Sequence, residues 1–363
     1  MKKLIIIGNG FDIAHGLETS YSDFLKYLKN QIVKVEINKD YTYSINIKGN
    51  QCGEFSDIIH KETNGKEDPW IAVVCKPNNK YELTYNPHKN SIYFKTLFQD
   101  KNKLGYWSDL ESHYFKTLYK NKDKPSNISI INEEFDYLKK LLIEYLNEIE
   151  DGVLVHETSE LILKNSIFNM IDSKMESQHQ FTDYHFVSFN YTSKILNKYI
   201  NHLKDENFIL EKKIHRPIYI HGDLLSGEGY PIIFGYGDEN STNYKELEVL
   251  ENGNYLKNFK TFQYLRKGQY GQILGYLESV VEDSTSIDST AVHVQVIGHS
   301  LNLTDKALLK TIFEHPNVKE IEVTYHKNES KYFEKLYNVS RIFDNNTDMR
   351  KKIVPLEKTF KII

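Results

Sequence analysis

His221, which is followed by Gly222, has the residue type and the setting of a general base. It directly follows the apolar run 217–220, which is typical of a short buried strand. A neutral imidazole has a reference pKa of about 6.5 and can take a proton near neutral pH. A histidine at this position can also be structural and donate to a nearby carbonyl, so both interpretations stay open.

The turn Gly8-Asn9-Gly10 has a pattern that suits phosphate binding. It directly follows the apolar run 4–7, and Phe11 and Asp12 come next. Glycines after a buried strand let a ligand approach the main chain, and the expected helix would direct its positive dipole end at that ligand. The full GxGxxG fingerprint is absent, because Ile13 stands at the third glycine position.

The same pattern recurs along the chain, where six apolar runs are each cut off by glycine or a small polar residue. These runs are 4–7, 185–189, 217–220, 231–234, 292–297 and 320–325. In an open parallel sheet, ligands bind outside the carboxyl ends of the strands. We therefore expect one sheet edge to gather the polar residues that follow: Asn9, Asp12, Asn190, His221, Asp238, His299 and Ser300. Simpler roles stay open, since Asn190 could cap a helix and Asp238 could belong to a turn.

The order of these runs predicts an α/β fold, Rossmann-like, with a mostly parallel sheet. We expect residues 1–35 and 180–363 to form this domain and residues 36–179 to be an insertion. Within the insertion, 36–100 is expected to be irregular with some β-structure and 101–179 helical. Helices are expected near 106–119, 132–149 (with Asn132 as a cap) and 154–175, and the tail beyond 327 is expected to pack on the surface.

Composition excludes some classes of partner. The chain of 363 residues has 46 basic and 50 acidic side chains, which argues against general affinity for nucleic acid or anionic membranes. No apolar run approaches the roughly 20 residues that span a bilayer. The two cysteines, Cys52 and Cys75, supply no metal or disulfide framework, which fits a reducing compartment. We expect a cytoplasmic protein.

Several segments together resemble the AbiH family of bacterial abortive-infection proteins, which is linked to phage defence. These segments are LIIIGNGFDIAHGLETSYSDF, YWSDLE, VSFNYT, YIHGDL and VIGHSLNLTDKALL. The resemblance covers both ends of the chain and is weakest over residues 36–100. It implies an anti-phage protein with a phage-derived trigger or partner protein, and it leaves a homo-oligomer open.

The AbiH family in turn resembles the sirtuin-like NAD-binding fold, and some defence proteins with that fold hydrolyse NAD. The resemblance matches Gly8-Asn9-Gly10 to the first glycine turn, Asn190 to the asparagine of a Thr-Gln-Asn-Ile-Asp type motif, and His221-Gly222 to the catalytic His-Gly. It implies that His221 and Asn190 are catalytic. The implied binding residues are Gly8, Asn9, Gly10, Phe11, Asp12, Tyr191, Thr192, Gly222, Gly298, His299 and Ser300.

The implied chemistry is cleavage of NAD, as substrate, to nicotinamide and ADP-ribose, with no metal. His221 would be the base, Asn190 would hold the water or the ribose, and Asp12 would hold a ribose hydroxyl. The sequence departs from the sirtuin-like pattern in one position, because Thr192 replaces an acidic residue. It also lacks a cysteine-rich zinc module, which argues against deacetylation.

Two other functions stay open. The same edge could bind NAD or ADP-ribose without chemistry, as a sensor that acts through a partner. A metal-dependent phosphoesterase or nuclease could use His221, Asp238 and His299, since oxygen and imidazole ligands can come from scattered positions. That class, however, has an early Asp-x-His and a paired-histidine GHxH loop, and this sequence has neither.

Overall fold

The computed structural model describes residues 1–24, 27, 72–76, 80–84, 92–93, 96–97, 107–152, 181–205, 213–224, 232–280, 289–326, 328–359 and 361–362. The chain divides into two compact units. The first unit contains residues 1–19, 146–244 and 258–363, and the second contains residues 20–145 and 245–257. The expected division into an α/β domain and an insertion at 36–179 stays a prediction.

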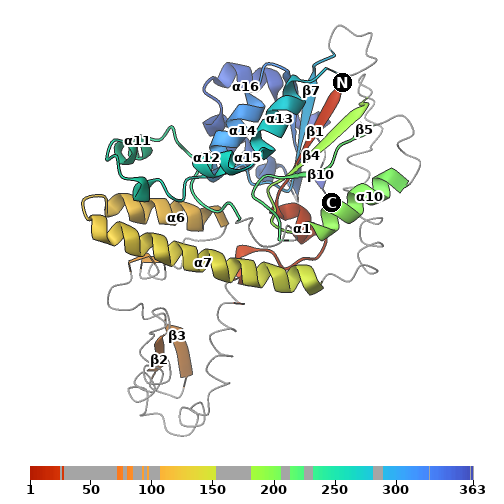
Figure 1. Ribbon diagram of the computed structural model, residues 1–363. Helices are drawn as coiled ribbons and strands as arrows, with labels where there is room; N and C mark the ends of the chain where they lie inside the picture. Colours follow the sequence, from red (N-terminus) through yellow and green to blue (C-terminus); the bar gives the residue numbers. More distant parts are fainter. Residues whose placement is uncertain are drawn as a thin grey trace. The chain divides into compact units, whose positions relative to one another are not determined.

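The first unit is built on a sheet whose described strands all pair in parallel (Figure 1). The strand order is β5-β4-β1-β7-β8, and β6 also pairs with β4. The strands are β1 (Lys2–Ile7), β4 (Asp183–Ser188), β5 (Lys213–Ile214), β6 (Ile218–Tyr219), β7 (Val292–Ile297) and β8 (Val318–Val323). This arrangement confirms the predicted α/β fold with a mostly parallel sheet.

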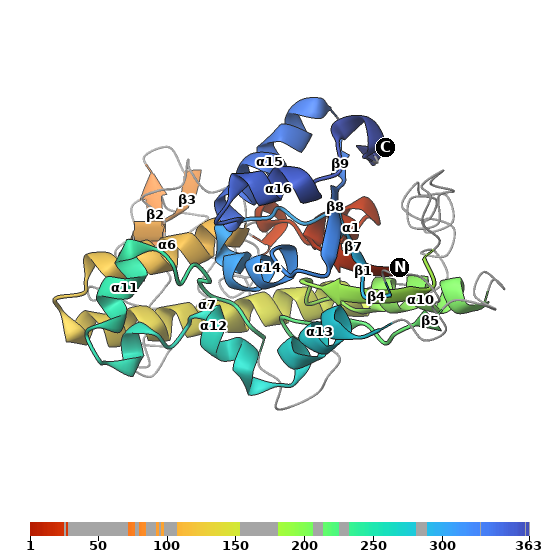
Figure 2. The same cartoon turned by 90° about the horizontal axis from the view of Figure 1, so that it is seen from above.

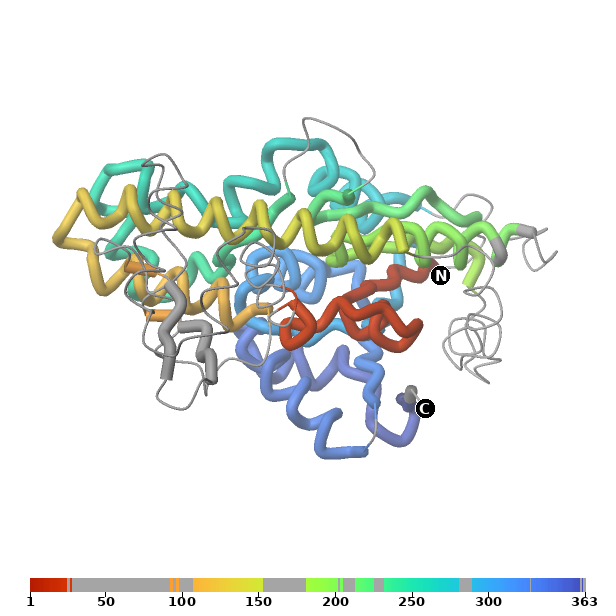
Figure 3. Tube along the Cα trace, turned by 90° about the horizontal axis from the view of Figure 1, so that it is seen from below, coloured from red at the N-terminus to blue at the C-terminus, as the bar shows by residue number. Residues whose placement is uncertain are grey.

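Strand β1 lies between β4 and β7, and all six of its residues are buried. In Figure 3 its red trace runs between the green and blue parts of the chain. Leu4 and Ile6 join one hydrophobic cluster, whereas Ile5 and Ile7 join another. Because both faces of the strand are covered, its segment Leu4–Ile7 is continuously apolar rather than alternating.

Helices cover the two faces of the sheet. Helix α10 (Lys194–Asp205) packs in the cluster of Ile5, and α13 (Gln269–Glu278) and α14 (Lys306–Phe313) pack in the cluster of Leu4. The short helix α1 (Asn9–Ala14), which follows β1, contributes Phe11 to the α10 side, while α14 follows β7 on the other side. Neighbouring strands thus lead to helices on opposite faces, which is the arrangement at which open α/β sheets bind ligands.

The C-terminal tail was expected on the surface, but part of it is core. Helices α15 (Glu329–Ile342) and α16 (Asn346–Lys352) contact β8, and they lie beside it in Figure 2. Val339 and Ile342 are fully buried in the cluster of Leu4. The tail sequence is rich in charge because only one stripe of α15 faces the sheet.

Smaller elements complete the two units. They are α11 (Thr242–Glu248), η1 (Gly253–Tyr255), α12 (Lys260–Gln263), η2 (Tyr264–Arg266), η3 (Leu303–Asp305), η4 (Leu356–Lys358), β9 (Tyr325–His326) and β10 (Lys361–Ile362). Of these, η1 and most of α11 belong to the second unit and the others to the first. The strand predicted at 231–234 is wrong, because the described residues from Ile232 to Phe234 form no strand. The chain there continues into Tyr236, which forms an isolated bridge with Phe259.

The second unit contains two packed helices and a hairpin. Helix α6 (Trp107–Lys120) packs on α7 (Pro125–Gly152, which continues into the first unit) through the rings of Tyr114 and Phe135, whose centroids are 4.0 Å apart. Strands β2 (Ala72–Lys76) and β3 (Lys80–Thr84) pair antiparallel. Asn132 lies inside α7 and hydrogen-bonds to Tyr114, so its predicted cap role is wrong. The helix predicted at 154–175 lies outside the described residues.

Candidate functional site

The turns that follow β1 and β7 are pressed together, backbone against backbone. Gly10 N–H donates to the carbonyl of Gly298 over 2.9 Å. A Cβ on Gly298 would lie 2.3 Å from Phe11 N, and one on Gly8 would lie 2.5 Å from the Cα of His299. Gly298 also has a φ of 70°, which favours glycine. The glycines are therefore required by contact between the two turns, whether or not a ligand lies over them.

Two residues expected to bind a ligand are occupied by protein contacts. The Asn9 side-chain amide donates to the carbonyl of Thr19 over 2.9 Å. The ring of Phe11 is fully buried and packs against His15 and Tyr199. Ile13, at the third glycine position of the fingerprint, is 47% exposed, so no close packing requires a glycine there. Asn9 and Phe11 thus shape the turn rather than present free side chains.

Asp12, Thr192 and Asn190 gather at the carboxyl ends of β1 and β4. The Thr192 hydroxyl donates a short hydrogen bond to the Asp12 carboxyl group. Burial raises the pKa of Asp12 to about 7, although Thr192 and Asn190 lower it in part. Thr192 replaces an acidic residue of the sirtuin-like pattern, and the structure places the carboxyl group of Asp12 beside Thr192.

The side-chain amide of Asn190 is a buried donor. The residue is 6% exposed, and its side chain lies close enough to Asp12 to lower the pKa of that carboxyl group, but among the described residues its Nδ2 meets no acceptor with good hydrogen-bonding geometry. Its backbone N–H donates to the hydroxyl of Ser188 over 3.1 Å. At the start of α10, Glu150 Oε1 accepts from the N–H groups of Ser193 and Lys194, and no hydrogen bond described in the structure joins the Asn190 side chain to that helix end. The expected alternative, a helix cap at Asn190, is wrong.

His221 is held through both ring nitrogens. Its Nδ1 lies 3.1 Å from the carbonyl oxygen of Phe189, and its Nε2 lies 3.1 Å from the hydroxyl of Tyr264. The residue is 4% exposed. Burial lowers its pKa, and the charge of Lys260 lowers it further. A neutral ring that donates from Nδ1 to Phe189 can accept the Tyr264 proton at Nε2.

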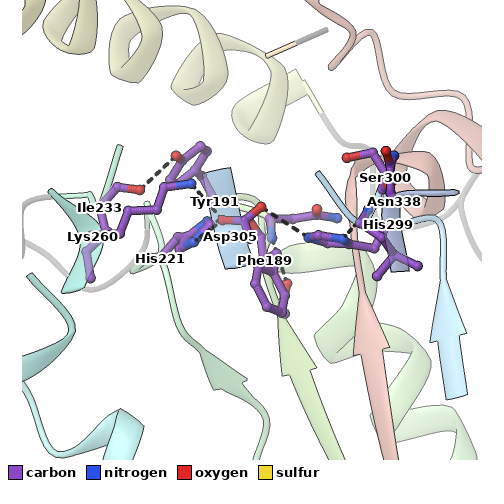
Figure 4. Close-up of polar contacts among 12 residues, drawn as sticks. Phe189, Tyr191, His221, Ile233, Lys260, His299, Ser300, Asp305 and Asn338 are labelled. Atoms are coloured by element: carbon purple, nitrogen blue, oxygen red, sulfur yellow. Dashed lines mark hydrogen bonds and ion pairs between the residues drawn. The ribbon is translucent and has the colours of Figure 1, made fainter. Parts of the chain in front are cut away.

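One carboxylate joins the two histidines that follow strands. Asp305 Oδ1 lies 3.3 Å from His221 Nε2, and its Oδ2 lies 3.4 Å from His299 Nε2 (Figure 4). Lys260 Nζ lies 2.6 Å from the same Oδ1. The Phe189 ring contacts both imidazoles, with centroid distances of 5.2 Å to His221 and 4.4 Å to His299.

The remaining predicted residues border this cluster. The Tyr191 hydroxyl donates to the carbonyl of Ile233 over 2.9 Å, as Figure 4 shows. Gly222 has a φ of 81°, which lets the chain turn directly after His221. Ser300 is exposed, and its carbonyl accepts from the Asn338 side chain over 3.0 Å. Asp238 accepts from the N–H of Asn240, which fits its alternative role in a turn.

The comparison with known families identifies the chain. A family model described as bacteriophage abortive infection AbiH matches residues 4–327. The chain belongs to the AbiH family. This confirms the resemblance found in the sequence and supports a role in abortive infection as a defence against bacteriophage. A search of the curated proteins finds no match.

The match with AbiH includes all the predicted site residues and ends before α15. No helix in the described part of the AbiH chain is long and apolar enough to cross a membrane. Within the same described ranges, no three His, Cys, Asp or Glu side chains are grouped so that they could hold a metal ion.

Three residues at this site of the AbiH protein were not predicted from the sequence: Lys260, Tyr264 and Asp305. Lys260 and Tyr264 lie in α12 and η2, which do not directly follow any of the six apolar runs. Asp305 is the N-cap residue of α14, but its side chain makes no cap hydrogen bond. A polar residue before a helix usually indicates a cap, so no signal in the sequence distinguished this carboxylate.

Proposed function

We propose that this AbiH protein binds NAD at the carboxyl edge of its sheet and hydrolyses it to nicotinamide and ADP-ribose. The observation that carries the proposal is the Asn190 side chain, which is buried beside the Asp12 carboxyl group and whose Nδ2 has no acceptor with good hydrogen-bonding geometry within the described structure. A ligand oxygen would give this buried donor a well-aligned partner. The Asn190 amide lies beside Asp12 at the carboxyl ends of β4 and β1, and β1 and its other neighbour β7 lead to helices on opposite faces of the sheet.

Asp12 and Asn190 together suit the hydroxyl and carboxamide groups of such a ligand. Because the pKa of Asp12 is about 7, its carboxyl group holds a proton in a large part of the molecules at neutral pH. It can then donate as well as accept a hydrogen bond. Asn190 can donate to a ribose oxygen or to the attacking water.

His221 is the proposed base, and Tyr264 is its route to the ligand. The Nε2 lone pair accepts from the Tyr264 hydroxyl, and Asp305 lies close enough to stabilise the imidazolium that forms. The Tyr264 hydroxyl would pass its proton to His221 Nε2 and take one from the water or the ribose hydroxyl. The ring of His221 stays fixed by Phe189 during this transfer.

The experiment is an assay of nicotinamide release from NAD by the purified protein, with and without lysate from phage-infected cells. His221→Ala and Asn190→Ala should each lower release by about 10²–10⁴-fold, the usual contribution of a positioned acid–base group. His326→Ala and Asn346→Ala change an exposed histidine and an exposed asparagine and should leave release unchanged. Release that survives both site substitutions would reject these catalytic residues.

A non-catalytic sensor of NAD or ADP-ribose is the second candidate. It is favoured by one observation: both nitrogens of His221 are already bound by protein groups. A sensor would bind the nucleotide in calorimetry without releasing nicotinamide, and it would keep that binding in His221→Ala. A protein that neither binds NAD nor releases nicotinamide would contradict both candidates.

A further inference from the structure

Lys260 and Asp305 form a buried ion pair between the two histidines. The side chain of Lys260 is 2% exposed and that of Asp305 is 11% exposed. Taking two charges out of water costs several kcal/mol for each ion, so a buried pair is weak evidence of a role in stability. Asp305 is also the N-cap residue of α14, but its carboxylate makes no hydrogen bond to a backbone N–H of that helix. The pair is therefore poorly explained by stability alone.

The backbone fixes which nitrogen of each histidine carries the proton. Leu301 N–H donates to His299 Nδ1 over 2.9 Å, so neutral His299 holds its proton on Nε2 and donates toward Asp305. The carbonyl of Phe189 accepts from His221 Nδ1, so neutral His221 has its lone pair on Nε2. Asp305 thus faces a donor on one histidine and a lone pair on the other.

A proton that arrives at His221 Nε2 would lie 3.3 Å from Asp305 Oδ1. The carboxylate favours that proton, whereas the ammonium of Lys260, 2.6 Å from the same oxygen, opposes it. We propose that Lys260 and Asp305 are positioning residues that set the protonation of His221 and couple it to His299. The role of His221 as a catalytic base rests on the proposed function. The effect of Lys260 and Asp305 on the protonation of His221 does not.

The groups that face His221 agree with this assignment. Burial and the charges of Lys260 and His299 lower the pKa of His221, while Asp305 raises it. Asp305 itself keeps a pKa well below its ordinary value because of Lys260 and the two histidines. Tyr264 and Tyr191 are the tyrosines whose rings lie beside the imidazole. Lys306, the next lysine of this region, pairs with Asp238 over 3.4 Å instead.

The test is an NMR titration of the full-length protein labelled at histidine Cε1. His221→Gln and His299→Gln assign the two signals. In Lys260→Met the midpoint of His221 should move to higher pH, and in Asp305→Asn it should move to lower pH. Asp305→Asn should also change the chemical shift of the His299 signal, because both rings lose the same carboxylate. Lys260→Arg keeps the charge and should return His221 toward its native midpoint.

Lys306→Met is the matched control, since it removes a neighbouring ammonium that does not contact Asp305 in the described structure, and His221 should titrate nearly as in the native protein. Thermal unfolding shows whether each variant is folded. Midpoints that stay fixed, or that move in the same direction in Lys260→Met and Asp305→Asn, would overturn the proposal.

The nicotinamide assay separates this proposal from the proposed function. Opposite shifts of the His221 midpoint without any nicotinamide release would support the positioning pair and reject NAD hydrolysis. Nicotinamide release with unchanged midpoints would reject the pair and leave NAD hydrolysis standing. If both hold, the acid limb of the pH–rate profile should move with the midpoint of His221 in each variant.

Discussion

The hydroxyl of Thr192 donates a hydrogen bond to the carboxyl group of Asp12, which lies 180 positions earlier in the sequence. The bond joins helix α1, which follows β1, to the segment after β4, and these strands are neighbours in the parallel sheet. It brings an acid beside Asn190 from a part of the chain that no local motif connects to it. The protonation of Asp12 therefore bears on stability and, under the proposed function, on ligand binding.

Asp12→Asn should change how stability depends on pH. The raised pKa means that the native protein loses stability as pH rises from about 4 to about 7, because only the unfolded chain readily releases this proton. The variant lacks that loss, so its relative stability should rise over this range by about 4 kcal/mol. Urea unfolding at several pH values measures this difference.

The exposed Asp348→Asn is the control for Asp12→Asn, and it should show no such trend. Parallel stability curves for Asp12→Asn and the native protein would mean that Asp12 is ionised in the folded state at neutral pH.

Tyr264→Phe should separate the two candidate functions. The ring stays in the core, but the hydroxyl that donates to His221 Nε2 is lost. If the proton passes through Tyr264, nicotinamide release should fall by about 10²–10⁴-fold while nucleotide binding stays close to native. Tyr270→Phe removes a hydroxyl that bonds to Thr311 and should not affect release. Full release in Tyr264→Phe would show that His221 acts without the tyrosine.

Gly298→Ala should destabilise the protein by more than 1 kcal/mol, an estimate from glycines with a positive φ. Its φ of 70° strains any other residue, and the new Cβ would collide with Phe11 N. Chemical denaturation gives the change in the free energy of unfolding. Gly275→Ala lies within α13 with open space around it and should instead stabilise by roughly 0.5–1 kcal/mol. Equal effects of the two substitutions would contradict the contact between the turns.

His185→Phe should make the protein more resistant to acid. His185 stacks on His215 and lies edge-on to Tyr276, and burial together with His215 lowers its pKa to about 4. The native protein should therefore lose stability as pH falls from about 6.5 to about 4, amounting to about 2 kcal/mol at pH 5. Melting temperatures at pH 7.5 and pH 5 compare His185→Phe with the exposed control His326→Phe. A similar acid loss in all three proteins would reject this role.

The strands of the sheet were predictable where both faces of the strand are covered. The run at 4–7 is continuously apolar, and the runs at 185–189 and 292–297 are mainly apolar with buried polar residues such as His293 and Gln295; the three runs correspond to β1, β4 and β7. The run at 231–234 looks the same, yet its described residues form no strand. An apolar run indicates that a segment is buried. Whether the segment pairs as a strand depends on neighbouring strands, which the run itself does not specify.

The site was predictable only where a side chain directly follows a strand. Asn190, His221 and His299 lie at strand ends, and the parallel topology brings those ends to one edge. Lys260, Tyr264 and Asp305 come from short helical segments, and their approach to His221 depends on how those segments pack. The charges and the spacing of residues in the sequence do not predict how these segments pack.

The contact between Gly8–Gly10 and Gly298 can form only late in the synthesis of the protein. These turns are separated by 290 positions, so β1 leaves the ribosome long before its neighbour β7 exists. At translation rates of 5–20 residues per second, the wait is roughly 15 to 60 seconds. During that time a growing chain has neither His299 nor Asp305, so a defence protein that is cut short in translation is left without its site.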